Sequence, residues 1–344
     1  MHSVGISLLG FGNVGQAFAR LLLEKKRSIQ DQFALDLKVV SIQTGHHGAT
    51  IDLEGINLPR ALDIMQAGDS LSTLSQNPVP DDVGALLEAS RASVMAENTP
   101  VSYADGQPAL DHIRAALARG IHVVTANKGP VVHAYNELTQ LAAACDCRFL
   151  FESTVMDGAP IFSLWRAALP VADLMSFRGV LNSTTNLILS RMETGETFEA
   201  AVTYAQSIGI VETDPSGDID GWDAAIKVAA LVTVLMGYEL LPQNVEREGI
   251  GAIQTEQVQA AIENGQRWKL VCEAHREGGR VSARVQPRLV DRTDPLFTVM
   301  GTSSAVTFHS DVLGALTVTE ADPGPHTTAY GLLADLVNIF RTVT

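Results

Sequence analysis

Short apolar runs alternate with amphipathic stretches along the first 150 residues of this chain. The apolar runs are predicted strands, at residues 4–9, 38–43, 93–97, 121–125 and 148–152. Amphipathic helices are predicted between several of them, as at residues 108–119 and 134–144. Repeated strand–helix units of this length predict an α/β fold with a doubly wound, parallel sheet of the Rossmann type.

The pattern changes near residue 151, after which strands and helices no longer alternate regularly. Helices are predicted at residues 161–168, 198–208 and 327–336. Strands are predicted around residues 175–181, 267–273, 280–287, 305–309 and 315–318. This arrangement predicts a second, α+β domain with a mostly antiparallel sheet and helices on one face.

A glycine-rich motif joins the first predicted strand to the first predicted helix. It reads Gly10-Phe11-Gly12-Asn13-Val14-Gly15. In this context the first glycine permits a tight turn, the second admits a pyrophosphate, and the third allows helix and strand to pack closely. The helix N-terminus then offers N–H groups to the phosphates. The alternative is a glycine-rich turn without a ligand, and the position between strand and helix favours a dinucleotide.

A turn-rich acidic loop at residues 211–221 leads into a helix that is apolar almost all round. Such a helix is predicted to be buried. Asp223 and Lys227 nevertheless share one of its faces, and no other charged residue follows until Glu239. Because a buried charge is costly unless it is paired, the two indicate the polar wall of an active site. A purely structural ion pair is the alternative.

Two strand ends carry further polar residues, and ligands of doubly wound sheets lie at such ends. Residues 98–100 follow one strand, and Lys128 follows another, where it is either a site residue or an ordinary loop lysine. The second strand ends in residues 43–47, Gln-Thr-Gly-His-His, with no acid before Asp52. An acid there would hold the ribose of NAD, so its absence slightly favours NADP. Two solvated histidines are the alternative.

Composition narrows the class of protein. The chain has 344 residues, 24 Lys plus Arg against 39 Asp plus Glu, and a net charge of −15. No basic patch stands out, so nucleic acid is not an expected partner, and no apolar run has membrane-spanning length. Cys145, Cys147 and Cys272 are too few for a zinc site or a disulfide framework, which is typical of reduced thiols in a cytoplasmic protein.

Together these motifs resemble the homoserine dehydrogenase family over nearly the whole chain. The resemblance is carried by residues 10–15, 125–128, 152–160, 179–186, 212–227 and 328–335. Residues 212–227 are the most specific, because the family has its substrate acids and its Asp/Lys pair at this spacing. We expect no aspartokinase segment before the chain and no large regulatory domain after it, as in the short, monofunctional form.

The resemblance implies the NAD- or NADP-dependent, reversible reduction of L-aspartate 4-semialdehyde to L-homoserine in threonine and methionine biosynthesis. It also implies a dinucleotide-binding domain of residues 1–150 and 320–344, and a domain for substrate binding and dimerisation of residues 151–319. The expected assembly is a homodimer formed through the second domain's sheet.

The family's functional residues fall on named positions of this sequence. Lys227 would donate the proton in reduction and accept it in oxidation. Asp223 would orient Lys227 and bind substrate. Lys128 would lie beside nicotinamide and substrate. The polar end of the amino acid would be bound by Glu212, Asp218 and Thr184. The implied cofactor residues are Gly10, Phe11, Gly12, Asn13, Val14, Gly15, Thr99, Lys128 and Gly324. A monovalent cation such as Na⁺ would bind backbone carbonyls of Glu152, Val155, Asp157 and Ala159.

Two departures from the family pattern bear on function. Ser183 replaces a glycine, which would alter a turn that needs a positive φ. Residues 320–325 replace a glycine-rich segment that closes over the cofactor, and only Gly324 matches. Two alternatives stay open: a related dehydrogenase with another substrate, and an inactive nucleotide sensor. The joint presence of a proton donor and its acidic partners argues against the sensor.

Overall fold

The computed structural model describes residues 1–75, 78–211 and 214–341, and the chain forms two compact units. Unit 1 consists of Met1–Gly158 and Gly324–Thr344, and unit 2 consists of Ala159–Pro323. The chain therefore leaves unit 1 once, builds unit 2, and returns to complete unit 1 with its last helix.

Unit 1 is built on a six-stranded sheet of order β3-β2-β1-β4-β5-β6. The strands are β1 (His2–Leu9), β2 (Leu35–Gln43), β3 (Ala49–Ile51), β4 (Val94–Glu97), β5 (His122–Thr125) and β6 (Phe149–Leu150). All neighbours are parallel except β2 and β3. Strand β1 pairs with β2 on one side and β4 on the other, so the strand order reverses beside β1, where such sheets bind ligands.

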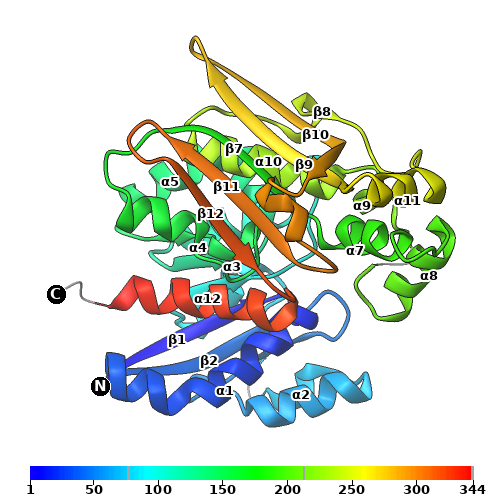
Figure 1. Ribbon diagram of the computed structural model, residues 1–344. Coiled ribbons are helices and arrows are strands. Elements are labelled where there is room, and N and C mark those ends of the chain that lie inside the picture. The colour runs from blue at the N-terminus through cyan, green and yellow to red at the C-terminus, as the bar shows by residue number, and fades with distance from the viewer. Residues whose placement is uncertain (76–77, 212–213, 342–344) are drawn as a thin grey trace. The chain divides into compact units, whose positions relative to one another are not determined.

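Most helices of unit 1 pack against this sheet. The helices are α1 (Asn13–Phe33), α2 (Leu58–Ala67), α3 (Val83–Ser90), α4 (Ala109–Leu117), α5 (Lys128–Ala144) and α12 (Pro325–Phe340), with short 3-10 turns at Leu71–Leu74 and Glu152–Thr154. Helices α1 and α12 lie side by side (Figure 1) and share one core with β1. That core fixes the turn between β1 and α1, which carries the glycine-rich motif.

Unit 2 is built on a second six-stranded sheet, of order β12-β11-β7-β9-β10-β8. Its strands are β7 (Leu174–Val180), β8 (Glu246–Arg247), β9 (Gln266–Glu277), β10 (Arg280–Asp291), β11 (Ser304–Ser310) and β12 (Ala315–Glu320). The pairs are antiparallel except β8 with β10. The predicted combination of a parallel sheet and a mostly antiparallel one is confirmed.

The helices of unit 2 include one that is buried over most of its length. They are α6 (Ile161–Ser163) with a π-helical turn at Leu164–Ala168, α7 (Ser183–Met192), α8 (Phe198–Ser207), α9 (Ser216–Ile219), α10 (Trp222–Leu235) and α11 (Thr255–Glu263), with 3-10 turns at Pro242–Asn244 and Pro295–Thr298. Helix α10 packs on β9 and β10 and is buried over most of its length, as its apolar composition predicts. It therefore holds its first two turns, with Asp223 and Lys227, in a fixed place.

Candidate active site

Three acidic or amide side chains of unit 2 meet at the start of α10. Asn182 caps the N-terminus of α7, where its Oδ1 accepts hydrogen bonds from the Thr185 N–H at 2.8 Å and the Thr185 hydroxyl at 2.9 Å. Its Nδ2 therefore points away from α7 and donates to Asp218 Oδ1 at 2.6 Å and to Asp223 Oδ2 at 3.0 Å. One buried amide thus holds two carboxylates from different elements together.

The Asp223–Lys227 pair lies next to this amide. Lys227 Nζ is 3.1 Å from Asp223 Oδ2 and donates to the carbonyl oxygen of Leu181 at 2.6 Å. The two charged side chains are only 15% and 12% exposed, which sets them apart from a solvated surface pair. The ammonium is therefore fixed by two oxygens at the edge of a polar site.

Asp218 lies in the same site as Asp223, and the Asp223 charge affects its pKa. Burial and the nearby Asp223 charge raise the pKa of Asp218, against hydrogen bonds from Asn182 and Thr184 that lower it. A site with two close carboxylates attracts a cation, and a substrate ammonium is such a cation. Thr184 and Asp218 thus lie together, as the resemblance implies, whereas Glu212 lies outside the described residues.

The glycine-rich motif of unit 1 has the shape that a pyrophosphate needs. Gly10 has a φ of +87°, and a Cβ on it would lie 2.5 Å from the carbonyl oxygen of Asn98. A Cβ on Gly15 would lie 2.5 Å from the Gly10 carbonyl oxygen, whereas one on Gly12 would meet no protein atom within 4 Å. Two glycines therefore permit close packing, and the third leaves open space at the N-terminus of α1, which fits a dinucleotide.

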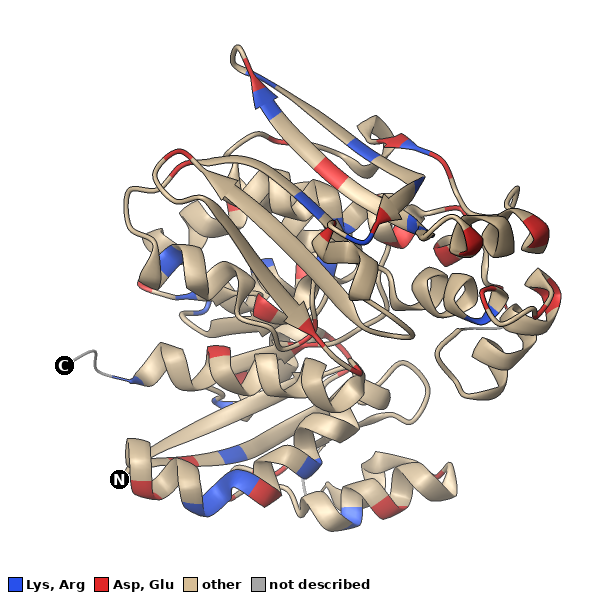
Figure 2. Cartoon of the chain, viewed as in Figure 1, with Lys and Arg blue, Asp and Glu red and all other residues tan. Residues whose placement is uncertain are grey.

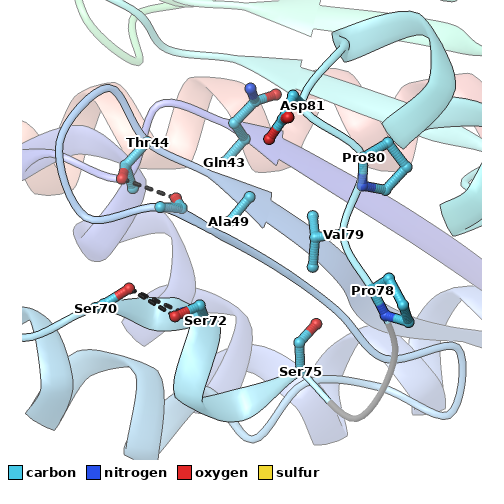
Figure 3. Close-up of a pocket in the computed structure, with 11 residues that line it drawn as sticks. Gln43, Thr44, Ala49, Ser70, Ser72, Ser75, Pro78, Val79, Pro80 and Asp81 are labelled. Atoms are coloured by element: carbon cyan, nitrogen blue, oxygen red, sulfur yellow. Dashed lines mark hydrogen bonds between the residues drawn. The ribbon is translucent and has the colours of Figure 1, made fainter.

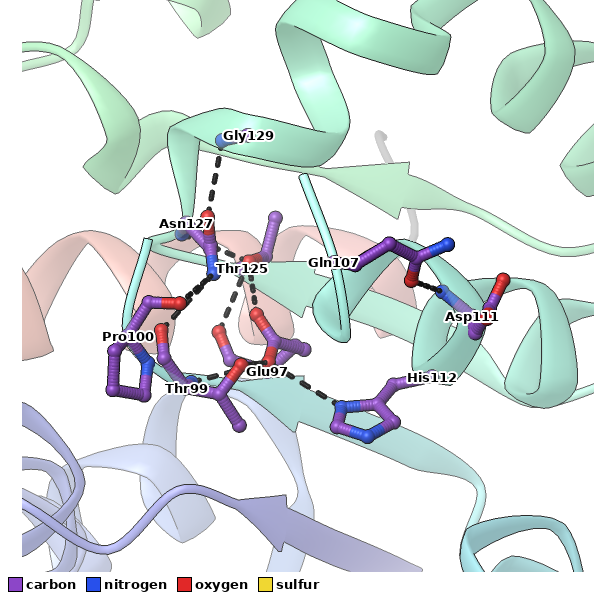
Figure 4. A network of polar contacts seen from close by, with 9 residues as sticks. All are labelled: Glu97, Thr99, Pro100, Gln107, Asp111, His112, Thr125, Asn127 and Gly129. Atoms are coloured by element: carbon purple, nitrogen blue, oxygen red, sulfur yellow. Dashed lines mark hydrogen bonds and ion pairs between the residues drawn. The ribbon is translucent and has the colours of Figure 1, made fainter. Parts of the chain in front are cut away.

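A network of polar contacts joins the ends of β4 and β5 (Figure 4). Glu97, at the end of β4, accepts hydrogen bonds from the Thr99 N–H at 3.1 Å and from the Thr99 hydroxyl. The Thr125 hydroxyl, at the end of β5, lies 3.3 Å from Glu97 Oε2. Asn127 caps α5 and donates through Nδ2 to the Thr99 carbonyl oxygen at 3.0 Å. Thr99 and the first residue of α5, Lys128, are therefore held on one rigid frame.

Both halves of the chain match models of one protein family. Residues 10–152 match the homoserine dehydrogenase NAD-binding domain, and residues 160–337 match the homoserine dehydrogenase domain. The chain belongs to the homoserine dehydrogenase family. It is 34% identical to the NAD(+)-dependent homoserine dehydrogenase of Pseudomonas canavaninivorans, over 100% of this chain and 98% of that protein.

Two further relatives are similar over nearly all of this chain. The homoserine dehydrogenase of Methanocaldococcus jannaschii is 33% identical over 98% of both chains. The crystal structure of a homoserine dehydrogenase from Thiobacillus denitrificans superposes with a TM-score of 0.83 at 29% identity, covering 99% of this chain and 74% of that one. The family assignment thus holds for sequence and fold alike.

Both departures from the family pattern lie at the N-terminus of a helix in this homoserine dehydrogenase. Ser183 is the first residue of α7 and follows the Asn182 cap, so the serine needs no positive φ there. Gly324 is the N-cap of α12 and Pro325 is its first residue, a position that suits proline. The Gly324 N–H donates to the Thr327 hydroxyl at 2.8 Å. The replaced segment thus starts α12.

Sequence analysis missed a polar pocket at the carboxyl end of β2. Its volume is about 610 Å³, and Figure 3 shows Asp81 beside Gln43, with Ser70 and Ser72 across the pocket. The other lining residues are Thr44, Gly48, Ala49, Ser75, Pro78, Val79 and Pro80, so hydroxyls and a carboxylate line the pocket, without Lys or Arg. Asp81 is distant in sequence from β2, which is why no local pattern connects the two.

A fully buried lysine in unit 2 was also missed. Lys269 has no exposed surface, and its Nζ donates to Asn186 Oδ1 at 2.8 Å and to the Val299 carbonyl oxygen. Asn186 Nδ2 in turn donates to the carbonyls of Gly301 at 3.0 Å and Ser303 at 3.1 Å. Helix α7, which carries the Asn182 cap, is thereby tied to the segment before β11.

Lys269 should make stability depend on pH. Burial lowers its pKa from 10.5 to about 8, against the nearby Glu193 charge, which raises it. Between these values the unfolded chain binds more protons at Lys269, so the contribution of this lysine to the free energy of unfolding should rise with pH by roughly 3 kcal/mol. Cys272, whose pKa burial raises to about 12, acts in the opposite direction in both proteins, so urea unfolding between pH 7.5 and 10.5 should show the rise as a growing difference in stability between wild type and Lys269→Met. Equal slopes in both proteins would contradict the prediction.

Other classes of site find no support in the described part of the chain. No group of three His, Cys, Asp or Glu side chains there is placed to hold a metal ion. The helices in the described ranges all lack the length or the apolar character needed to cross a bilayer. Figure 2 shows the basic residues mostly scattered among acidic ones in this view.

Proposed function

We propose that this homoserine dehydrogenase interconverts L-aspartate 4-semialdehyde and L-homoserine with Lys227 as its proton donor and acceptor. The observation that carries the proposal is the Lys227 ammonium, held between Asp223 Oδ2 and the Leu181 carbonyl at the edge of a site with two acids. A bound nicotinamide cofactor would supply or accept the hydride.

Lys227 and Asp223 would stabilise the charge that develops on the substrate oxygen and transfer its proton. Reduction of an aldehyde builds negative charge on its oxygen, which the Lys227 ammonium stabilises and then protonates. In the reverse direction the neutral amine accepts the proton of the homoserine hydroxyl. Asp223 keeps the lysine in place, because an ion pair 3.1 Å long restricts the side chain.

The remaining acids would select an amino acid. Asp218 and Glu212 would bind the substrate ammonium, and Thr184 would add a hydroxyl next to Asp218. A substrate without the ammonium would leave two neighbouring carboxylates repelling each other, so we expect semialdehydes without an amino group to be rejected.

The nucleotide would bind unit 1. The motif Gly10-Phe11-Gly12-Asn13-Val14-Gly15 would hold its pyrophosphate, with Thr99, Lys128 and Gly324 as further contacts. The open space above Gly12 and the hydrogen-bonded frame around Thr99 support this assignment. Lys128 would lie beside the nicotinamide.

The cofactor preference should be for NAD. The slight preference for NADP rested on the lack of an acid at the end of β2, and Asp81 supplies one from another segment. A carboxylate accepts a hydrogen bond from the ribose 2′-hydroxyl and repels a 2′-phosphate. The Pseudomonas relative named as NAD(+)-dependent agrees with this choice.

Asp81→Asn should move this preference toward NADP. We expect the ratio of kcat/KM for NAD to kcat/KM for NADP to fall about tenfold, because one repulsive charge is removed. Steady-state kinetics with both cofactors measures the ratio. Asp63→Asn, which removes an exposed acid of α2, is the matched control and should leave it unchanged. A ratio unchanged in Asp81→Asn would exclude this role.

The proposal also covers assembly, a cation site and location. A homodimer through the sheet of unit 2 would give twice the chain mass in light scattering. A monovalent cation such as Na⁺ would bind carbonyls of Glu152, Val155, Asp157 and Ala159, of which the first two and the last are buried residues. Titration of dialysed protein with NaCl would test it. A cytoplasmic location fits the three unpaired cysteines.

The deciding experiment is a spectrophotometric assay at the absorbance band of reduced nicotinamide. L-Homoserine with NAD should produce a rise, and NADP a slower one. No rise with either cofactor, despite measurable nucleotide binding, would favour a related dehydrogenase with another substrate or an inactive nucleotide sensor. A panel of other amino-alcohols then separates these two readings.

A further inference from the structure

Glu97 is a buried carboxylate at the carboxyl end of β4 that the proposed chemistry does not use. It is 0% exposed. Its oxygens accept hydrogen bonds from the Thr99 N–H at 3.1 Å, from the Thr99 hydroxyl, and from the Thr125 hydroxyl at 3.3 Å. The Thr99 N–H can only donate, so Oε1 of Glu97 acts as an acceptor, and the Thr125 hydroxyl divides between Oε2 and the Glu97 backbone carbonyl oxygen at 3.0 Å.

The charge of Glu97 has one ionisable partner among the described residues. His112 Nδ1 of α4 lies 3.7 Å from Glu97 Oε1, the contact drawn as a dashed line in Figure 4, and this nitrogen makes no hydrogen bond. The imidazole side chain is 16% exposed. In the described part of the chain Glu97 makes no ion pair with lysine or arginine, so no directly paired permanent cation neutralises its charge.

The carboxylate lies directly behind the segment that faces the nucleotide motif. A Cβ on Gly10 would lie 2.5 Å from the Asn98 carbonyl oxygen and 2.8 Å from the Thr99 nitrogen, so residues 98–99 pack against the first turn of the motif. Glu97 fixes that same Thr99 nitrogen. It therefore sits next to the point where the strand order reverses and the ligand crevice of such sheets opens.

We propose that the buried charge of Glu97 makes unit 1 prefer the oxidised nicotinamide cofactor over the reduced one. The inference rests on the cofactor site proposed above. Oxidised nicotinamide carries a positive charge on its ring and reduced nicotinamide is neutral there. A buried negative charge near the ring acts on the first form and hardly on the second. Glu97 would thereby favour the aldehyde-reducing direction.

The charge effect differs from a purely structural role in one measurable way. A residue that only orders the loops around Thr99 would help both redox forms equally, because they share every atom except the transferred hydride. A charge changes the ratio of the two dissociation constants. This ratio is measured in the absence of substrate, so it does not depend on turnover.

The test is the Kd of NAD⁺, NADH and ADP-ribose for wild type and Glu97→Gln, by calorimetry at one pH and one ionic strength. We expect the ratio of the NAD⁺ Kd to the NADH Kd to rise about tenfold, equivalent to about 1.4 kcal/mol. ADP-ribose, which lacks nicotinamide, should bind within twofold of wild type. Glu88→Gln removes an exposed acid of α3 and should change none of the three values.

Each other outcome decides against the inference or against its premise. Equal weakening of NAD⁺ and NADH in Glu97→Gln would leave a structural role only, and an unchanged ratio with unchanged affinities would leave none. If wild type bound neither dinucleotide, the proposed cofactor site itself would fail. If Glu97→Gln did not fold, His112→Lys, which puts a permanent cation beside the carboxylate, should raise the same ratio, and no rise there would overturn the inference.

Discussion

Lys227→Met should lower kcat for homoserine oxidation by about three orders of magnitude or more. The methionine keeps the length of the side chain but neither accepts nor donates a proton, and general acid–base catalysis contributes roughly 10² to 10⁴ in rate. Loss of the ammonium next to the developing alkoxide adds to that effect. The Kd of NADH, measured by fluorescence, should stay within a few-fold because the nucleotide residues belong to unit 1.

Two measurements separate chemistry from folding in this variant. Lys227→Met removes the partner of Asp223, but Asn182 still donates to that carboxylate at 3.0 Å, so the far-UV spectrum should remain that of wild type. Small amines added to Lys227→Ala should restore part of the rate, because they can occupy the truncated position. Most of the activity surviving in Lys227→Met would show that the proton moves through another group.

Much of unit 1 follows from local patterns in the sequence. Strand β1, the glycine motif and α1 are contiguous, so hydrophobic periodicity and backbone requirements act on the same short segment. The same holds for α10, whose apolar composition predicts burial and whose i,i+4 pair is present at 3.1 Å. These features require no knowledge of distant contacts.

Other elements were missed although the sequence carries their signals. Helix α2 has Asn57 as N-cap and a proline in its first turn, and Asp82 caps α3. The strands β9 and β10 are longer than predicted and meet at Gly278 and Gly279, both with positive φ, as a two-residue hairpin requires. The charged residues Glu277 and Arg280 flank this turn and are exposed.

The parts of the site that sequence did not reveal depend on long-range contacts. Asn182 was part of a family motif without a role, and only the fold shows it bridging Asp218 and Asp223. The sequence predicts only that Glu97 ends a buried strand, whereas the fold shows that Thr99 and Thr125 donate hydrogen bonds to its carboxylate. Buried polar groups must find partners, but the sequence does not say where those partners lie.

Gly12→Ala should weaken nucleotide binding without changing the stability of the protein. A Cβ at Gly12 meets no protein atom within 4 Å, and Gly12 has a φ of −77°, so the folded chain accepts alanine without strain. The new methyl group would instead project into the open space at the N-terminus of α1, where the pyrophosphate is expected. We expect the Kd of NADH to rise by roughly one to two orders of magnitude while Tm stays within about 2 °C.

Gly15→Ala is the matched comparison, because the same methyl group there meets protein instead of open space. Its Cβ would lie 2.5 Å from the Gly10 carbonyl oxygen, so helix and strand must separate, at a cost of about 1–3 kcal/mol in the free energy of unfolding. Thermal unfolding and NADH titration of both variants measure the contrast. If Gly12→Ala bound NADH as wild type does, the pyrophosphate would not lie over this glycine, and the nucleotide site proposed for unit 1 would be wrong.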